Sequence, residues 1–151
     1  MISNSVNEKM ISFKELEKKI FKYVCELGCE ITRSILEAYD DAVAVKRDKQ
    51  KYRNKGKRAT CIKTVYGSVK YQRRIYGTIT ENGEKAYVYL LDAEMRMDKI
   101  GMISSNLAEK IAMTVTESPY RVTAETISST SGQSISASGV WNVMQRLGEK
   151  I

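Results

Sequence analysis

A helical period runs through residues 13–45 and constrains the possible folds of this chain more than any other feature. Within it, apolar residues recur at steps of three and four, close to a heptad: Phe13, Leu16, Ile20, Val24, Leu27, Ile31, Ile35, Ala38, Ala42 and Val45. A continuous helix of this length measures roughly 50 Å at 1.5 Å per residue. A globule of 151 residues cannot cover such a rod alone. The helix therefore breaks near Gly28, folds back as core of its own domain, or packs its seam on a partner chain as a possible homodimer.

The segment that follows, residues 46–58, is strongly basic. It holds eight cations: Lys46, Arg47, Lys49, Lys51, Arg53, Lys55, Lys57 and Arg58. Asp48 is its single anion, so the net charge of the run equals the +7 of the whole chain. Such a run either forms a solvated face or contacts the phosphate backbone of DNA. Tyr52 lies inside it, where a ring can pack against a sugar or a base.

A β section is predicted between this run and residue 101. Segments rich in β-branched and aromatic residues predict three strands, at residues 59–67, 68–76 and 85–91. Gly67 marks the first turn, and Asn82-Gly83 favours a type I′ turn before the third strand. We expect a small three-stranded antiparallel sheet, covered by a helix because three strands are marginally stable alone. Four cations give this sheet a basic surface beside the run: Lys63, Lys70, Arg73 and Arg74.

Three short helices are predicted at the C-terminal end. The first spans Asn106–Glu117 and has a capping-box-like start at Asn106. The second has Ser118 as its N-cap and Pro119 at its first helical position, where a missing N–H costs nothing. Gly132 can end it in a left-handed conformation.

The third helix, capped by Ser136, has two contrasting sides. One side predicts core, with a stripe of apolar residues: Val140, Val143, Met144 and Leu147. The other side, with Trp141 at its edge, presents groups that can read base edges in a major groove: Ser138, Asn142, Gln145 and Arg146. Arg121 lies where the preceding helix crosses a DNA backbone. The pattern is typical of a helix-turn-helix, although similar helix pairs occur in domains that never bind DNA.

Several classes of site are excluded or disfavoured. Because the chain has no histidine, histidine-based triads and mixed cysteine–histidine zinc sites are impossible. Three cysteines, Cys25, Cys29 and Cys61, are too few for an all-cysteine tetrahedral site, and we interpret them as reduced core residues of a cytoplasmic protein. No glycine-rich phosphate loop is present, and the adjacent Asp40 and Asp41 are poorly placed as a metal clamp. We therefore expect no metal, no cofactor and no enzymatic activity of the chain itself.

Membrane association is not expected either. The longest apolar run, residues 86–91, is far too short to span a bilayer. The first residues lack the basic start and apolar block of a signal peptide.

Three stretches resemble the N-terminal part of a family of bacterial insertion-sequence transposases, whose members are often described as an uncharacterised protein family. They are IKTVYGSVKYQRRIY, YVYLLD and SPYRVTAETISSTSGQSISASGVWNVMQRLGEKI. The helix pair also resembles mutator-type transposases, with Ala124 in the first helix, Ser136 opening the second, and Gly132 between them. The resemblance implies that an RNase H-like domain with three acidic, metal-binding catalytic residues follows the helix-turn-helix. This chain would then be a truncated element copy or an excised N-terminal part.

These observations predict an α+β protein in four segments. They are an N-terminal helical segment (1–45), a basic linker (46–58), a small antiparallel β section (59–101) and a helix-turn-helix unit (102–151). The function expected is that of a DNA-binding transposase fragment, which recognises double-stranded DNA at the ends of its element. The alternatives are a helical dimerisation or assembly module, and a DNA-binding regulator unrelated to transposition.

Overall fold

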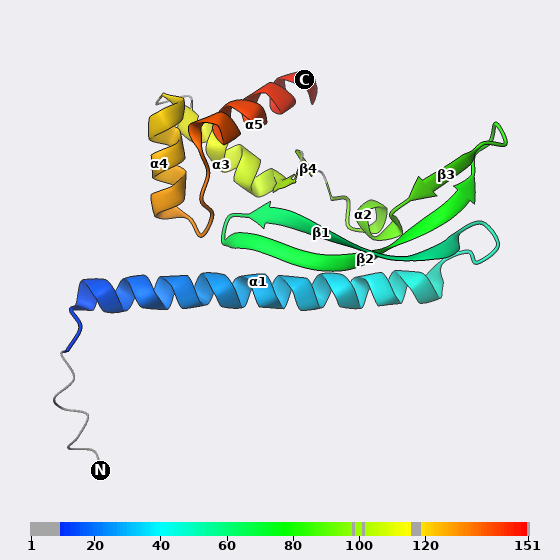
Figure 1. Cartoon of the computed structure of the whole chain (residues 1–151), viewed down its shortest axis with the longest axis horizontal. Helices are drawn as coiled ribbons and strands as arrows, with labels where there is room; N and C mark the ends of the chain where they lie inside the picture. The colour runs from blue at the N-terminus through cyan, green and yellow to red at the C-terminus, as the bar shows by residue number, and fades with distance from the viewer. Residues whose placement is uncertain (1–9, 98, 101, 116–118, 151) are drawn as a thin grey trace, which may run out of the picture.

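One long helix lies along the sheet, and three short helices gather at one end of it (Figure 1). The structure is a computed structural model and describes residues 10–97, 99–100, 102–115 and 119–150. The predicted α+β class and the long N-terminal helix are confirmed. Two groups of buried residues form the interior, one between the long helix and the sheet and one among the three short helices.

The long helix α1 (Phe13–Lys46) is continuous over 34 residues. A capping box starts it: Ser12 Oγ accepts from the Glu15 N–H, and the Glu15 carboxylate accepts from the Ser12 N–H. The expected alternative of a break near Gly28 is wrong. A Cβ at Gly28 would lie 3.2 Å from the Tyr66 ring, so the glycine lets this ring pack closely on the helix, and this contact offsets the intrinsic cost of a glycine in a helix.

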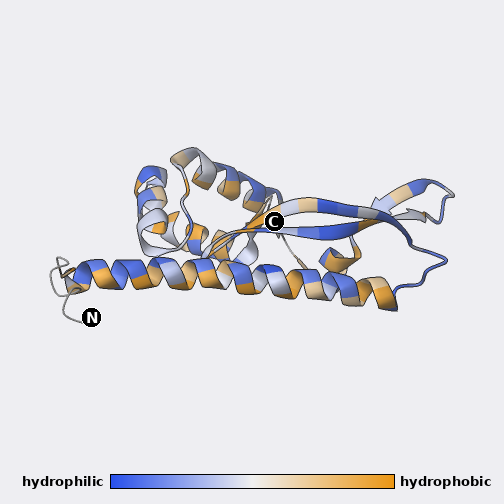
Figure 2. Cartoon of the chain, turned by 60° about the horizontal axis from the view of Figure 1, so that its bottom comes forward, coloured by the Kyte–Doolittle hydropathy of each residue, from blue (hydrophilic) through white to orange (hydrophobic). Residues whose placement is uncertain are grey.

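The apolar seam of α1 is not the side that meets the sheet. The sheet-facing side carries Cys29, Leu36 and Asp40, and Leu36 joins the buried group formed with the sheet. The opposite side is exposed, with Ile20 at 53% and Ile31 at 51% exposure. Figure 2 brings this outer side forward and shows hydrophobic residues along the helix. The expectation that the seam forms core of its own domain is therefore wrong.

The sheet is larger than predicted. Its strands are β1 (Arg53–Thr64), β2 (Gly67–Ile79), β3 (Lys85–Val88), β4 (Lys99–Ile100) and β5 (Ile103–Ser104), in the order β3-β2-β1-β5-β4. The antiparallel meander of β1, β2 and β3 was expected, but β5 pairs parallel to β1 and makes the sheet mixed. Strands of two residues are too short to show a period, which is why the sequence did not predict β4 and β5.

Two boundaries also differ from prediction. The first strand begins at Arg53, so the second half of the predicted basic linker is strand. The third strand ends at Val88, and Leu90 starts the short helix α2 (Leu90–Glu94), whose Leu91 is buried against the sheet. A helical turn at this point buries Leu91 in the core, which a longer edge strand would not do.

The hairpin between β2 and β3 is confirmed, but its predicted type I′ turn is wrong. Ile79 pairs with Lys85, which leaves a five-residue loop. Within it the Gly83 N–H donates to the Thr80 carbonyl at 2.9 Å, and Gly83 has a φ of 80°. A type I′ turn also needs a positive φ at Asn82, which the structure does not give. Longer loops of this kind are built around other turns.

The three short helices are α3 (Ser105–Val115), α4 (Tyr120–Thr130) and α5 (Ala137–Lys150). Their shared core is apolar: Leu107, Ala108, Ile111, Ala124, Ile127, Val140 and Val143. The cap of α3 is Ser104, whose hydroxyl accepts from the Leu107 N–H at 3.2 Å, so the predicted cap at Asn106 is wrong. Pro119 precedes α4 as its N-cap rather than lying at its first position, and the predicted cap Ser118 is outside the described residues.

Gly132 has a role different from the predicted left-handed C-cap. The C-cap of α4 is Ser131, in extended conformation, and Gly132 is not among the residues with positive φ. A Cβ at Gly132 would lie 2.2 Å from the Tyr66 carbonyl oxygen. The Gly132 N–H donates to the Val65 carbonyl at 2.9 Å. The missing side chain thus lets the helical unit dock on the β1–β2 turn.

Candidate nucleic-acid interface

A basic arm forms the end of the sheet furthest from the three short helices. We define it as residues 49–58 together with the paired end of β2 and strand β3. It extends past the C-terminal end of α1 (Figure 1). The first seven residues of β1 are exposed on both of its faces, since no helix covers them. The cations of this strand therefore face solvent, as a phosphate contact requires.

A shallow groove of about 330 Å³ runs along the arm. Four cations and one aromatic ring line it: Lys51, Arg53, Lys55, Lys85 and Tyr87. Gly77 forms part of its floor, where a Cβ would lie 3.0 Å from Lys55 Cε and 3.8 Å from the Tyr87 ring. Cations beside an exposed ring are the groups with which proteins hold a phosphate backbone and stack on bases.

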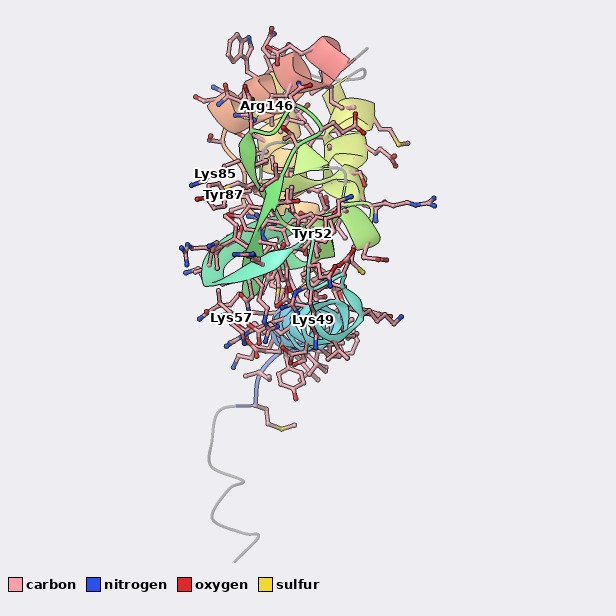
Figure 3. The ribbon with its side chains drawn as sticks, turned by 90° about the vertical axis from the view of Figure 1, so that its right-hand side faces the viewer. Lys49, Tyr52, Lys57, Lys85, Tyr87 and Arg146 are labelled. Carbon is pink, nitrogen blue, oxygen red and sulfur yellow. The ribbon has the colours of Figure 1, made fainter. Side chains whose placement is uncertain are left out.

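Lys85 and Tyr87 are groove residues that the sequence analysis missed. Figure 3 shows them on the same side of the ribbon as Lys57. Tyr87 is 63% exposed, whereas its strand neighbours Ala86 and Val88 are partly buried. The alternation of strand residues after the Asn82-Gly83 turn was the signal that could have identified them.

Several residues of the basic run have structural roles. The Asp48 carboxylate accepts from the Gln50 and Lys51 N–H groups at 2.9 and 3.2 Å and shapes the turn after α1. Arg47 Nε donates to the Tyr52 carbonyl at 3.1 Å, and its guanidinium lies 5.3 Å from the centre of the Tyr76 ring. Arg47 is thus held within the fold. The other seven cations of the run are exposed.

Tyr52 is less available for a nucleic-acid contact than predicted. It is half-buried, its N–H donates to the Asp48 carbonyl at 2.9 Å, and Lys51 Nζ lies 5.2 Å from the centre of its ring. In Figure 3 it lies nearer the middle of the molecule than Tyr87. Tyr87 is therefore the better placed ring.

Arg73 and Arg74, predicted as part of a basic surface, pair with acidic residues instead. Arg73 pairs with Asp92 and stacks on the Tyr89 ring, with its guanidinium 3.8 Å from the ring centre. Arg74 Nη1 lies 2.7 Å from both Asp40 Oδ2 and Asp41 Oδ1. The hydrogen bond from Arg74 lowers the pKa of Asp41 and raises that of Arg74.

These two pairs exclude the arginines from our candidate interface. Asp40 is 1% exposed and also accepts from the Arg74 N–H at 3.0 Å, so the pair anchors α1 to β2. A guanidinium bound to two carboxylates has little charge left for a phosphate. Lys63 and Lys70 of the same sheet are exposed.

Helix α5 presents the predicted polar side to solvent. Its cap is confirmed, since Ser136 Oγ accepts from the Gly139 N–H at 3.0 Å. The four predicted reading residues are all exposed: Ser138, Asn142, Gln145 and Arg146. Val140 and Val143 are buried in the shared core, as predicted, and Met144 and Leu147 are only partly buried. Trp141 lies at the edge, 50% exposed.

Arg121 lies in the first turn of α4 and is exposed. Its Nε is 3.8 Å from Glu125 Oε1, an exposed pair that contributes little and leaves the side chain free to move to a phosphate. The structure does not bring α5 into contact with the arm, since α5 packs on α3, α4 and β4. Figure 3 shows Arg146 on α5, above the side of the arm that carries Lys85 and Tyr87.

The described residues hold no group of three or more histidine, cysteine, aspartate or glutamate side chains suited to a metal ion. Cys25, Cys29 and Cys61 are free thiols, and burial raises the pKa of the Cys29 thiol. Within the same part of the chain, no helix combines the length and the apolar character needed to cross a membrane.

Comparison with known proteins gives one family. No curated protein and no solved structure matches the chain. The model of the uncharacterised protein family UPF0236 matches residues 6–150, which include α1, the sheet and the three short helices. Because this match covers far more than half of the sequence, the chain belongs to the UPF0236 family.

Proposed function

We propose that this chain is the DNA-binding part of an insertion-sequence transposase and recognises double-stranded DNA at the ends of its element. One observation carries the proposal. Seven of the eight cations in the run that holds the whole net charge of the chain face solvent, and six of these seven lie in the projecting arm. A charge that served only solubility need not be gathered in one projecting segment.

The arm supplies affinity without sequence preference in this proposal. Lys51, Arg53, Lys55, Lys57 and Lys85 neutralise phosphates and release the counterions condensed on DNA. Tyr87 lies among these cations, where its ring can pack on a sugar or stack on an unpaired base. Such contacts position the protein on DNA but do not read its sequence.

Helix α5 supplies sequence discrimination. Asn142 and Gln145 are suited to paired hydrogen bonds with adenine, and Arg146 to guanine or a phosphate. Val140 and Val143 hold the helix on α3 and α4, so the polar side faces outward. Arg121 of α4 reaches the backbone beside the groove that α5 enters.

The assignment to transposition rests on the resemblance of residues 62–76, 87–92 and 118–151 to insertion-sequence transposases. Cutting and joining of strands is then the task of an RNase H-like domain that these 151 residues do not include. The chain itself binds DNA and leaves it intact.

The salt dependence of DNA binding tests the proposal. The variant Arg53→Gln/Lys55→Gln/Lys57→Gln removes three exposed cations of the arm. Its log–log slope of affinity against salt should be about 2.7 less steep than that of the native chain, at 0.9 per phosphate contact. The control Lys14→Gln/Lys18→Gln/Lys22→Gln loses the same charge at the opposite end of α1 and should leave the slope unchanged (Figure 1). Equal slopes for the native chain and the arm variant would mean that the arm is a solvated face.

A further inference from the structure

The outer face of α1 is apolar, and none of the residues that the structure describes covers it. An amphipathic helix normally turns its apolar stripe toward the core of its own domain. Here Asp40 faces the sheet while the outer side exposes Phe13 at 75%, Val24 at 56% and Ile35 at 47%. Exposed apolar surface of this extent marks an interaction site. This face therefore needs an occupant outside the fold described above.

The stripe repeats every eleven residues. Steps of eleven residues join Phe13 to Val24 and Val24 to Ile35, and the same step joins Leu16 to Leu27. Within each step, successive stripe residues are three, four and four positions apart. Eleven residues in three turns is about 3.67 per turn, close to the 3.6 of a straight helix. The stripe therefore stays on one side of α1, which is straight in Figure 1. A second straight helix of similar length can pack along the whole stripe.

The sizes of the stripe residues match a second copy of α1 running in the opposite direction. The N-terminal half carries large residues, such as Leu16 and Ile20, and the C-terminal half carries Ala38 and Ala42. With a two-fold axis at the level of residue 29, Leu16 faces Ala42 and Ile20 faces Ala38. Large side chains then meet small ones, as close packing requires. A parallel pair would set alanine against alanine and leave voids.

The charges beside the stripe favour the same direction. In an antiparallel pair, the same edge of each helix meets its copy. Lys19 and Glu37 share one edge, and Lys19 of one copy lies within one helical turn of the level of Glu37 of the other. Glu26 and Glu30 lie on this edge near the axis, where each approaches its own copy, a repulsion that salt screens.

The area is sufficient for a stable pair. Eight large apolar side chains of the stripe are between 41% and 77% exposed: Phe13, Leu16, Ile20, Val24, Leu27, Ile31, Ile35 and Val45. At roughly 100 Å² of free surface each, they amount to about 800 Å² per copy, which equals the roughly 800 Å² per partner of a standard interface. We propose that two copies of this chain pair antiparallel through the outer faces of α1. The basic arms then lie at opposite ends of the pair. This pairing does not depend on the proposed function.

Sedimentation measures the pairing. The native chain at micromolar concentration should sediment as a dimer, and Ile20→Glu/Leu27→Glu should sediment as a monomer with unchanged helix content. The control Val122→Glu places the same charge on an exposed apolar residue of α4 and should remain a dimer. A native chain that stays monomeric at about 100 μM overturns the proposal and assigns the face to another partner.

Cysteine crosslinking measures the direction. Under mild oxidation, Leu16→Cys/Ala42→Cys should form a covalent dimer more readily than the native chain with its three cysteines. Leu16→Cys alone should not, because the two equivalent positions lie about 39 Å apart in an antiparallel pair. Efficient crosslinking of Leu16→Cys alone would show a parallel pair and overturn the assigned direction.

Discussion

Substitution of Gly132 by alanine tests how the helical unit is held on the sheet. The added Cβ would lie 2.2 Å from the Tyr66 carbonyl oxygen and 2.4 Å from its carbonyl carbon. Ordinary contacts begin near 3.4 Å, so the turn after α4 must retreat by more than 1 Å. Backbone atoms cannot rotate away as a flexible side chain can. The hydrogen bond of 2.9 Å from the Gly132 N–H to the Val65 carbonyl is lost in that movement.

The expected loss in the free energy of unfolding of Gly132→Ala has two contributions. Loss of the hydrogen bond costs about 1 kcal/mol. Overpacking of a close contact costs about 1–3 kcal/mol. The Gly132 backbone is not in the left-handed region, so alanine adds no conformational strain of its own. A total of about 2–4 kcal/mol is a large part of the roughly 10 kcal/mol that stabilises a domain. At about 2–4 °C per kcal/mol, the melting temperature should fall by roughly 4–16 °C.

Thermal and urea unfolding, followed by circular dichroism, measure this change. The matched control is Gly148→Ala, at a helical glycine with no atom within 4 Å of the added Cβ. It should leave stability unchanged or raise it by up to about 1 kcal/mol, because alanine favours helix. Equal melting temperatures for Gly132→Ala and the native chain would refute the contact between the α4–α5 turn and Tyr66.

Three further predictions concern the reading helix, alkaline stability and catalysis. Asn142→Ala or Gln145→Ala should weaken the free energy of binding to element-end DNA by about 1–3 kcal/mol and change binding to scrambled DNA little, as measured by competition binding. Equal losses of binding free energy on both DNAs would exclude α5 as the reading helix. Burial raises the pKa of Tyr71 to about 12, so its contribution to stability is fully present below pH 10 and is lost as pH rises through 12. Between pH 9 and pH 11.5, the free energy of unfolding by urea should therefore fall less for Tyr71→Phe than for the native chain, by up to about 2 kcal/mol; equal losses would contradict a buried neutral Tyr71. Purified chain should not nick or join DNA with magnesium or manganese, since such chemistry needs carboxylates that hold the metal; nicking that disappears on replacement of one of its own acidic residues would contradict this.

The elements predicted correctly are those whose signals are local. The period of residues 13–45 defines α1, because steps of three and four place residues on one helical face whatever lies around them. The Asn82-Gly83 pair predicts the β2–β3 hairpin for a similar reason. The signal for the outward side of α5 is also local. Because Val140 and Val143 are buried in the core, the helical repeat places Asn142 and Gln145 in solvent.

The candidate site was only partly predictable, because a cation's availability depends on its neighbours in space. Arg74 differs little in sequence context from an exposed strand arginine, yet Asp40 and Asp41, more than thirty residues away, bind its guanidinium. Lys85 joins the groove because strand pairing brings β3 beside β2 and so near Arg53. The ion pairs of Arg74 have no local signal, and the alternation that places Lys85 on one face of β3 does not tell which cations of β1 lie near it.

The sequence by itself determined the four longer helices, the main hairpins and the location of the charge, because backbone propensity and side-chain period act over a few residues. The tertiary structure alone decided which side of α1 meets the sheet. The small and polar side, with Cys29 and Asp40, packs there, because Tyr66 and Arg74 of the hairpin fit it. The apolar seam is left outside. Gly132 likewise acquires its role only through Tyr66, which no period in the chain can place beside it.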